Sequence, residues 1–180
     1  MKLTVIGGGG VRAPLFVASA LRRAATVGLD EICLMDVDGP KLALTGALAQ
    51  GVARKAGSPV RVTMTTDARQ ALDGAAFVVT TIRVGGDEGR VLDERIALRH
   101  GVLGQETTGP GGFAMALRSI PAILGYARLR DELCPDAWMF NFTNPAGLVA
   151  QALHDAGFAR AVGICDSANG AQEAIAARLG

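Results

Sequence analysis

The sequence carries almost no net charge and few cysteines. Lysine and arginine total 18 against 17 aspartates and glutamates, which leaves a net charge of +1. So small a charge provides no basic surface for nucleic acid or an acidic membrane, so we expect neither as a partner. The three cysteines are Cys33, Cys134 and Cys165, and no two of them form a Cys-x-x-Cys pair. Neither a disulfide scaffold nor a zinc ribbon is supported.

Long hydrophobic runs are also missing. Hydrophobic residues make up 49% of the chain. Even so, charged residues or Asn and Pro interrupt every apolar stretch before it reaches the roughly 18 residues of a membrane span. The first apolar stretch covers only residues 3–6 and runs into glycines, unlike the apolar region of a secretory signal. We therefore expect a cytoplasmic protein with neither a membrane span nor a secretory leader.

What the sequence does contain is an alternation of short apolar runs with longer stretches of helical period. The expected strands cover residues 2–7, 31–36, 60–65, 76–82, 138–142 and 161–165. The expected helices cover residues 13–26, 40–56, 92–100, 114–133, 145–156 and 171–178, with a weak helical turn at 67–72. This order predicts an α/β fold with a three-layer, doubly wound parallel sheet. A chain of this length buries about 69% of its surface, enough for one core.

Glycine is in excess and lies at particular places. The chain has 24 glycines, and eight of them fall between residues 85 and 112. Residues 84–91 and 101–112 are expected to be irregular, and long glycine-rich loops in a compact domain are usually functional. Gly28 and Gly57 are expected to end the preceding helices in the left-handed conformation.

The first expected strand runs directly into a glycine turn. A dinucleotide site uses one glycine for a tight turn and a second for the approach of the pyrophosphate, which rests on the next helix N-terminus. Two registers fit, Gly7-x-Gly9-x-x-Arg12 and Gly8-x-Gly10-x-x-Ala13. The candidate cofactor-binding residues of the turn are Gly7, Gly8, Gly9, Gly10, Val11 and Arg12. The simpler alternative is that these glycines serve only a tight turn.

Asp36 ends the second expected strand, where an NAD site holds the adenosine ribose with a carboxylate. A carboxylate there disfavours the extra phosphate of NADP, so we predict NAD as the cofactor. The alternative is that Asp36 merely begins the Asp-Val-Asp-Gly-Pro turn.

Polar residues gather at the ends of the later strands, where ligands bind in open α/β sheets. Arg83 follows the fourth expected strand and Asn144 follows the fifth. Taken alone, Arg83 is equally compatible with a surface charge and Asn144 with a helix cap. Cys165 and Asp166 end the sixth strand, where a thiolate could meet a metal or a substrate.

Together these segments resemble glycoside hydrolase family 4, the NAD-dependent 6-phosphoglycosidases. The motifs that carry the resemblance are the initial Ile-Gly-Gly-Gly, Arg83-Val-Gly-Gly, Asp93-Glu94-x-Ile96, Gly104-Gln-Glu-Thr-x-Gly-x-Gly-Gly112, Ala116-Leu-Arg-x-Ile-Pro121, Asn141-x-Thr-Asn-Pro-Ala-Gly147 and Gly163-x-Cys165. The resemblance covers the whole chain. It implies a Rossmann-like NAD-binding domain over residues 1–180, with the family's C-terminal catalytic and oligomerisation domain absent.

The resemblance implies hydrolysis of 6-phospho-glucosides by redox-assisted elimination. NAD⁺ would take hydride from C3 of the sugar, a base would remove the acidified C2 proton, and the aglycone would leave C1. Water would then add and the hydride would return to C3, while a divalent metal, commonly Mn²⁺, stabilises the developing negative charge. The expected substrate is a phosphorylated disaccharide or glucoside, and the full-length protein is expected to be a homo-oligomer.

Matching motifs assign roles at the later strand ends. By resemblance, Cys165 is a metal ligand and Asp166 is the candidate general acid. Asn144 would contact the cofactor, the sugar hydroxyls and the metal.

The segment after the fourth strand receives its roles in the same way. By resemblance, Arg83 contacts the cofactor and Glu106 lies near the sugar or the metal. Arg90 would bind the substrate's phosphate, a task that suits a bidentate guanidinium.

The sequence departs from the family pattern after its metal cysteine. Family members commonly follow Asp or Asn there with a hydrophobic residue and proline, whereas this chain has Asp166-Ser167-Ala168. The segment 83–121 looks closest to the 6-phospho-β-glucosidases, so we favour that branch. In the family, the second metal ligand, a histidine, and the tyrosine base lie in the C-terminal half. We expect neither in this chain, which stops at Gly180 and whose only tyrosine, Tyr126, lies within an expected helix.

We therefore expect this chain to bind cofactor without turning over substrate. Two alternatives share its features. One is a 2-hydroxy-acid dehydrogenase of the lactate or malate type, which has the same fold and glycine turn. The other is a non-catalytic dinucleotide-sensing module.

Overall fold

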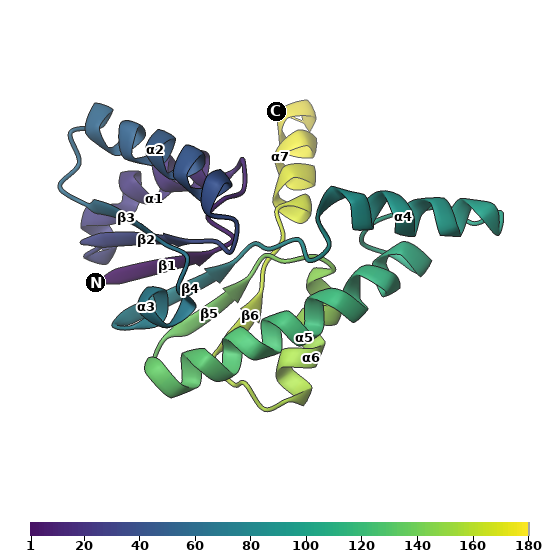
Figure 1. The fold of residues 1–180 in the computed structure, drawn as a ribbon. Helices are drawn as coiled ribbons and strands as arrows, with labels where there is room; N and C mark the ends of the chain where they lie inside the picture. Colours follow the sequence, from purple (N-terminus) through teal and green to yellow (C-terminus); the bar gives the residue numbers. More distant parts are fainter. Residues whose placement is uncertain (180) are drawn as a thin grey trace.

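In the computed structural model, which describes residues 1–179, six parallel strands form one sheet with helices on both faces (Figure 1). The strands are β1 Lys2–Ile6, β2 Glu31–Met35, β3 Arg61–Thr65, β4 Ala75–Thr80, β5 Trp138–Asn141 and β6 Ala161–Gly163. The helices are α1 Ala13–Val27, α2 Gly39–Lys55, α3 Ala68–Leu72, α4 Gly86–Arg99, α5 Gly109–Leu133, α6 Ala146–Asp155 and α7 Ser167–Leu179. The strand order β3-β2-β1-β4-β5-β6 confirms the doubly wound sheet.

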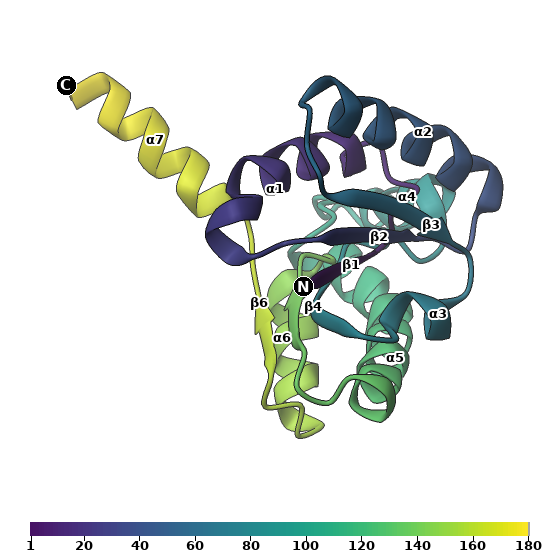
Figure 2. The same cartoon turned by 90° about the vertical axis from the view of Figure 1, so that its left-hand side faces the viewer.

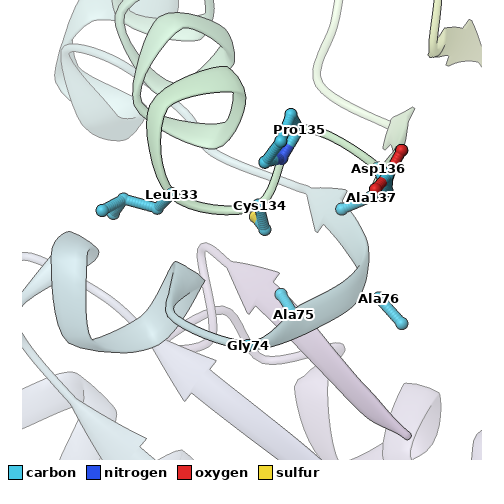
Figure 3. Close-up of a pocket in the computed structure, with 8 residues that line it drawn as sticks. All are labelled: Gly74, Ala75, Ala76, Leu133, Cys134, Pro135, Asp136 and Ala137. Atoms are coloured by element: carbon cyan, nitrogen blue, oxygen red, sulfur yellow. The ribbon is translucent and has the colours of Figure 1, made fainter.

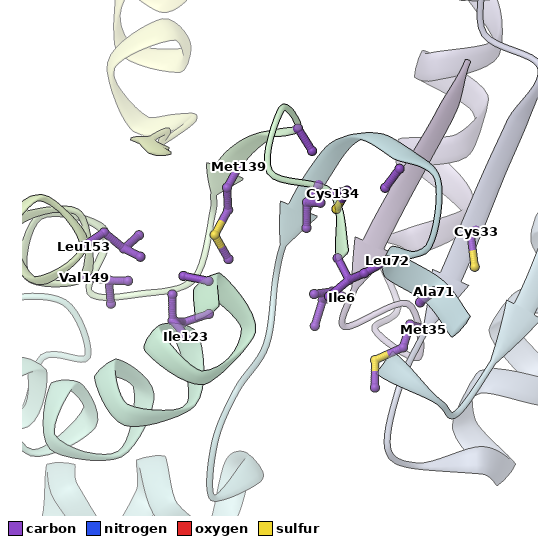
Figure 4. Packing of buried hydrophobic residues seen from close by; sticks show 14 residues of the cluster. Ile6, Cys33, Met35, Ala71, Leu72, Ile123, Cys134, Met139, Val149 and Leu153 are labelled. Carbon is purple, nitrogen blue, oxygen red and sulfur yellow. The ribbon is translucent and has the colours of Figure 1, made fainter. Parts of the chain in front are cut away.

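The sheet separates two apolar cores, because alternate residues of each strand point to opposite faces. Val5 of β1 packs with α1 and α2, whereas its neighbour Ile6 packs with α5 and α6. Figure 4 shows the second core, in which Ile123, Met139 and Leu153 interlock between the sheet and these two helices. The three layers therefore follow directly from the period of the strands.

Several helix boundaries have the predicted cause. Gly28 ends α1 at a φ of 65°, and Gly57 follows α2 at a φ of 59°, both left-handed as expected. The side chain of Asp38 caps α2 by accepting a hydrogen bond from the Lys41 N–H at 3.0 Å. The glycine ends depend only on the local chain, which is why the sequence alone predicts them; the Asp38 cap is also local but is not among the expectations.

Two glycine-rich regions are more helical than predicted. Helix α4 begins at Gly86, within the region expected to be irregular, and carries Asp87 and Glu88 in a first turn that favours negative charge. Helix α5 begins at Gly109, with Pro110 in its first turn. The expectation of irregular chain over residues 84–91 and 101–112 is therefore wrong at these helix starts.

The glycines at the start of α5 allow a close approach between the helix and the loop before it. A Cβ on Gly111 would lie 2.5 Å from the Gln105 carbonyl oxygen, and one on Gly112 would lie 2.4 Å from that of Thr107. Any side chain at either position would displace this loop, which carries Glu106.

Helix α7 extends away from the carboxyl edge of the sheet (Figures 1 and 2). Its side chains, where described, are exposed. Among residues 1–179, none of the helices has both the length and the apolar character needed to cross a bilayer.

Candidate functional site

The predicted site residues gather at the carboxyl edge of the sheet. The glycine turn follows β1, Asp36 follows β2, Arg83 follows β4 and Asn144 follows β5. The connections reverse direction between the adjacent strands β1 and β4, and an open α/β sheet binds its ligand at such a point. The glycine turn lies directly at this reversal.

The glycine turn is wedged between two strand ends. Gly7 has a φ of 101°, and a Cβ there would lie 2.2 Å from the Thr81 carbonyl oxygen. A Cβ on Gly8 would lie 2.7 Å from Leu34 Cβ. The N–H groups of Gly7 and Gly8 both donate to the Met35 carbonyl, at 2.9 and 2.8 Å. Backbone contacts to both neighbouring strands therefore fix this turn.

Asp36 joins the turn to the end of β2. Its Oδ2 accepts a hydrogen bond from the Gly9 N–H at 2.9 Å, and its Oδ1 accepts one from the Asp38 N–H at 3.0 Å. A Cβ on Gly9 would lie 2.8 Å from Oδ2, so only glycine permits this approach. Asp36 thus begins a turn, as one alternative expected, and also contacts the glycine turn, which sequence reasoning missed.

These features fit a dinucleotide. The turn presents glycine backbone, and Val11 and Arg12, which lead into α1, are exposed to solvent. A pyrophosphate approaching here would meet the positive end of a helix of 15 residues. The carboxylate of Asp36 lies beside the same turn, where a ribose would follow.

Glu106 contacts three candidate residues: Arg83, which follows β4; Arg90, which lies on α4; and Asn144, which follows β5. Its Oε2 accepts a hydrogen bond from Arg83 Nη1 at 2.9 Å and forms an ion pair with Arg90 Nη1 at 3.1 Å. Its Oε1 accepts one from Asn144 Nδ2 at 3.1 Å. The Arg90 Nε also donates to Glu94 at 2.8 Å. We call Arg83, Arg90, Glu106 and Asn144 the Glu106 cluster.

The charges of the Glu106 cluster shape its electrostatics. Burial raises the pKa of Glu106, but hydrogen bonds and charge attraction from Arg83 and Arg90, with the Asn144 hydrogen bond, outweigh it and leave the pKa lowered. The Glu106 side chain is 18% exposed, against 36% and 42% for the two arginines. The carboxylate therefore lies beneath the arginines and holds these like charges together at the surface.

Cys165 and Asp166 lie in the exposed segment between β6 and α7. A hydrogen bond between Cys165 Sγ and Ser167 Oγ, at 3.3 Å, lowers the pKa of the thiol. Asp166 Oδ2 lies 3.4 Å from Arg12 Nη1, which brings the end of β6 to the glycine turn. Sequence reasoning placed both residues at this edge but did not foresee this ion pair.

A complete metal site is not formed by the described residues. Within residues 1–179, no three His, Cys, Asp or Glu side chains are grouped to hold a metal ion. Cys165 offers one thiolate, and a divalent cation takes four or more ligands. The described residues therefore supply, at Cys165, only part of the predicted metal site.

A surface pocket lies at the opposite edge of the sheet (Figure 3). It has a volume of about 390 Å³ and is lined by residues 74–76, at the start of β4, and 133–137, which precede β5. None of the predicted site residues lines it, so it plays no part in the candidate site.

Comparisons with known proteins agree with this geometry. The model of the family 4 glycosyl hydrolases matches residues 2–180. A probable 6-phospho-beta-glucosidase of Bacillus subtilis is 43% identical over 99% of this chain and 41% of its own length. The 6-phospho-alpha-glucosidase 1 of Lacticaseibacillus paracasei is 36% identical over 99% of this chain and 41% of its length.

A solved structure shares the fold closely. The 6-phospho-beta glucosidase of Thermotoga maritima, with NAD and glucose-6-phosphate, has a TM-score of 0.92 and 31% identity. The match covers 99% of this chain and 43% of that one, and another structure of that enzyme also contains manganese. This chain thus spans about two fifths of the length of the relatives it matches. Since the family model extends over nearly every residue, the chain belongs to glycoside hydrolase family 4.

Proposed function

We propose that this chain is the NAD-binding part of a 6-phospho-glucosidase that uses NAD⁺ and Mn²⁺. The observation that carries the proposal is the meeting of the glycine turn, Asp36 and the Glu106 cluster at one edge of the sheet. The Thermotoga relative, which has the same fold, has been solved with NAD, manganese and glucose-6-phosphate. Family membership also disfavours both alternatives, the 2-hydroxy-acid dehydrogenase and the sensing module.

The glycine turn binds the cofactor's pyrophosphate through its backbone and the start of α1. Asp36 accepts hydrogen bonds from the ribose hydroxyls, and its negative charge rejects the additional phosphate of NADP. Arg83 and Asn144 lie beyond β4 and β5, and contact the part of the cofactor that extends across the reversal between β1 and β4. NAD⁺ supplies the reversible removal of hydride from the sugar.

The Glu106 cluster binds the phosphorylated sugar. Arg90 is 42% exposed, so its guanidinium is accessible to a phosphate dianion while Glu106 and Glu94 fix its direction. Asn144 and Glu106 provide an amide and a carboxylate for the sugar hydroxyls. Holding two arginines by one carboxylate prepares this site before the substrate arrives.

Asp166 donates a proton to the departing aglycone, and Cys165 provides one metal ligand as a thiolate. The lowered pKa of Cys165 favours this thiolate form. Further ligands of the metal come from outside the described residues, and a metal there would stabilise negative charge on the oxidised sugar. Asp166 is kept near the glycine turn by Arg12.

We assign the β-linkage to the substrate, because the Bacillus relative named for it is more similar than the Lacticaseibacillus relative named for the α-linkage. We also assign the whole protein to the cytoplasm, as a homo-oligomer. Metabolism of sugar phosphates inside the cell is consistent with the first assignment, and the second follows from the resemblance to the family alone.

Calorimetric titration of NAD⁺ into this chain tests the cofactor assignment. We expect saturable binding that Asp36→Ala weakens about tenfold, the equivalent of one charged hydrogen bond. Asp155→Ala, at the far end of α6, is the matched control and leaves the affinity unchanged. Absence of binding at millimolar NAD⁺ would overturn the assignment.

The activity is tested in the whole protein with a nitrophenyl 6-phospho-β-glucoside, NAD⁺ and Mn²⁺. We expect hydrolysis that requires both additions and that Cys165→Ser abolishes. Hydrolysis that persists without NAD⁺, or that Cys165→Ser leaves intact, would contradict the proposal. A preference for the α-linked substrate would contradict only the assignment of the linkage.

A further inference from the structure

Three family motifs without an assigned common role meet at the side chain of Arg118. Arg118 belongs to the Ala-Leu-Arg motif of α5. Its guanidinium contacts Asp93, from the motif on α4, and Val84, from the motif after β4. These motifs are far apart in sequence, so only the fold reveals that they share one contact.

The contact is bidentate and largely shielded. Nη1 and Nη2 of Arg118 donate to Oδ1 and Oδ2 of Asp93 at 3.0 and 2.5 Å, while Nε donates to the Val84 carbonyl at 3.2 Å. The Asp93 carboxylate is only 6% exposed, and the Arg118 side chain is 31% exposed. Paired hydrogen bonds of this kind fix geometry as well as supplying attraction.

Two glycines, Gly85 just before α4 and Gly89 in its first turns, lie against the guanidinium of Arg118. A Cβ on Gly85 would lie 3.0 Å from Arg118 Nε, and one on Gly89 would lie 3.4 Å from Nη2. A side chain at Gly85 would also be strained by its φ of 87°. Gly85 thus makes room for Arg118, which gives this glycine a specific cause, whereas a Cβ on Gly89 would only touch the guanidinium.

Helix α4 buries few of its own side chains. Its buried residues are Asp93 and Ala97, and its large apolar side chains Leu92 and Ile96 are 54% and 46% exposed. The helix packs against α5, so the Asp93–Arg118 pair is the principal polar link in that contact. Arg118 therefore supplements a small apolar contact between the two helices.

The same link sets the separation of Arg90 from Glu106. Arg90 lies on α4 one turn before Asp93, and Glu106 lies in the loop that leads into α5. Arg118 joins these two helices and so fixes the frame in which Arg90 and Glu106 pair at 3.1 Å. A shift of α4 by a fraction of a turn would break that pairing.

We propose that Arg118 is a positioning residue: it fixes α4 on α5 through Asp93 and Val84, and thereby holds Arg90 in place to receive the phosphate of the substrate. The last step rests on the proposed function of the Glu106 cluster. The positioning of α4 does not, because it concerns only contacts within the chain.

Amide hydrogen exchange and ligand titration together test this role. We compare Arg118→Met, which removes the hydrogen bonds to Asp93 and Val84, with Arg118→Lys. The lysine keeps the positive charge but cannot donate the paired hydrogen bonds of the guanidinium. Arg128→Lys, an exposed arginine of the same helix, is the matched control. Arg118→Met is expected to speed exchange in α4 by at least about tenfold and to leave β1 and β2 protected.

Calorimetry with glucose-6-phosphate provides the functional readout. Arg118→Met is expected to weaken its binding about tenfold or more, Arg118→Lys less, and neither to change NAD⁺ affinity by more than about twofold.

Hydrogen exchange and calorimetry test the role of Arg118 and the function of the Glu106 cluster separately. Unchanged exchange in α4 in both Arg118 variants would overturn the positioning role, whatever the ligand does. If the unsubstituted chain binds no glucose-6-phosphate, the proposed function of the Glu106 cluster fails while the exchange arm still decides the role of Arg118. If Arg118→Met does not fold, Arg118→Lys gives the decisive comparison with Arg128→Lys.

Discussion

The two sides of the carboxyl edge are built by different forces. Around β1 and β2, the backbone fills the space: Gly7 and Gly8 touch the ends of β4 and β2, and tolerate no side chain. Around β4 and β5, charged side chains make the contacts: Glu106 pairs with Arg83 and Arg90, and Asp93 pairs with Arg118. Added side-chain volume should therefore lower the stability of the protein most at the β1–β2 side. At the β4–β5 side, stability should depend instead on pH, on salt and on the loss of a charge.

The largest effect is expected from Gly7→Ala. The new Cβ would lie 2.2 Å from a backbone oxygen at a φ of 101°, and neither strand end can retreat without losing ladder hydrogen bonds. We expect the free energy of unfolding to fall by about 3 kcal/mol or more, measured by urea denaturation. Gly125→Ala in α5 meets nothing within 4 Å and should stabilise by up to about 1 kcal/mol. If the Gly7→Ala protein is as stable as the parent, the backbone around this turn does leave room for a side chain, contrary to our description.

A smaller effect is expected from Glu106→Gln, which keeps the shape but removes the charge between Arg83 and Arg90. We expect a loss of about 1–2 kcal/mol in unfolding free energy at neutral pH. Because folding lowers the pKa of Glu106, its contribution is complete above the ordinary value of 4.5 and is lost as pH falls through the lower folded value. Urea denaturation of both proteins from neutral to acidic pH should show the difference shrinking only on that acidic side. A difference that stays constant with pH would rule out a charge effect.

Salt should distinguish the two sides further. Raising NaCl from 0.1 to 1 M shortens the screening length from about 10 to about 3 Å. The destabilisation by Glu106→Gln should then decrease, since the arginines are partly exposed, whereas that by Gly7→Ala should stay the same. Denaturation at both salt concentrations checks this, and equal salt sensitivity of the two variants would remove the proposed distinction.

The smallest effect is expected at the opposite end of the sheet. Arg61 pairs with Glu31 at 2.8 Å between β3 and β2, but its side chain is 72% exposed. Arg61→Gln should cost at most about 0.5 kcal/mol, because water competes for an exposed pair. Since Glu31 and Glu106 are similarly buried, a loss as large as that of Glu106→Gln would mean that the lower exposure of Arg83 and Arg90 is not what gives the Glu106 cluster its strength.

The sequence predicts the local features of this molecule well. The order of strands and helices and the glycine helix ends at Gly28 and Gly57 follow from patterns a few residues long. The gathering of Asp36, Arg83 and Asn144 at one edge follows from them too, since parallel strands all point the same way. The physical cause in each case acts within one element or one connection.

The contacts between distant segments could not be predicted in this way. The early starts of α4 and α5 contradict the ordinary effect of glycine, because Gly85, Gly111 and Gly112 are required by neighbours that approach them in space. Nothing in the spacing of Asp93 and Arg118 indicates that they pair. The motifs identify such residues as candidates, but their partners depend on how α4 and α5 pack.

The hydrogen bonds of Asp36 have a consequence for the entropy of ligand binding. Each of its carboxylate oxygens already accepts one backbone hydrogen bond, from Gly9 or Asp38, and an oxygen of this kind accepts two. The side chain is therefore immobilised before any ligand arrives, with lone pairs left for two further donors. Ordering a free side chain on binding costs about 0.5–1.5 kcal/mol, and here folding has already met that cost.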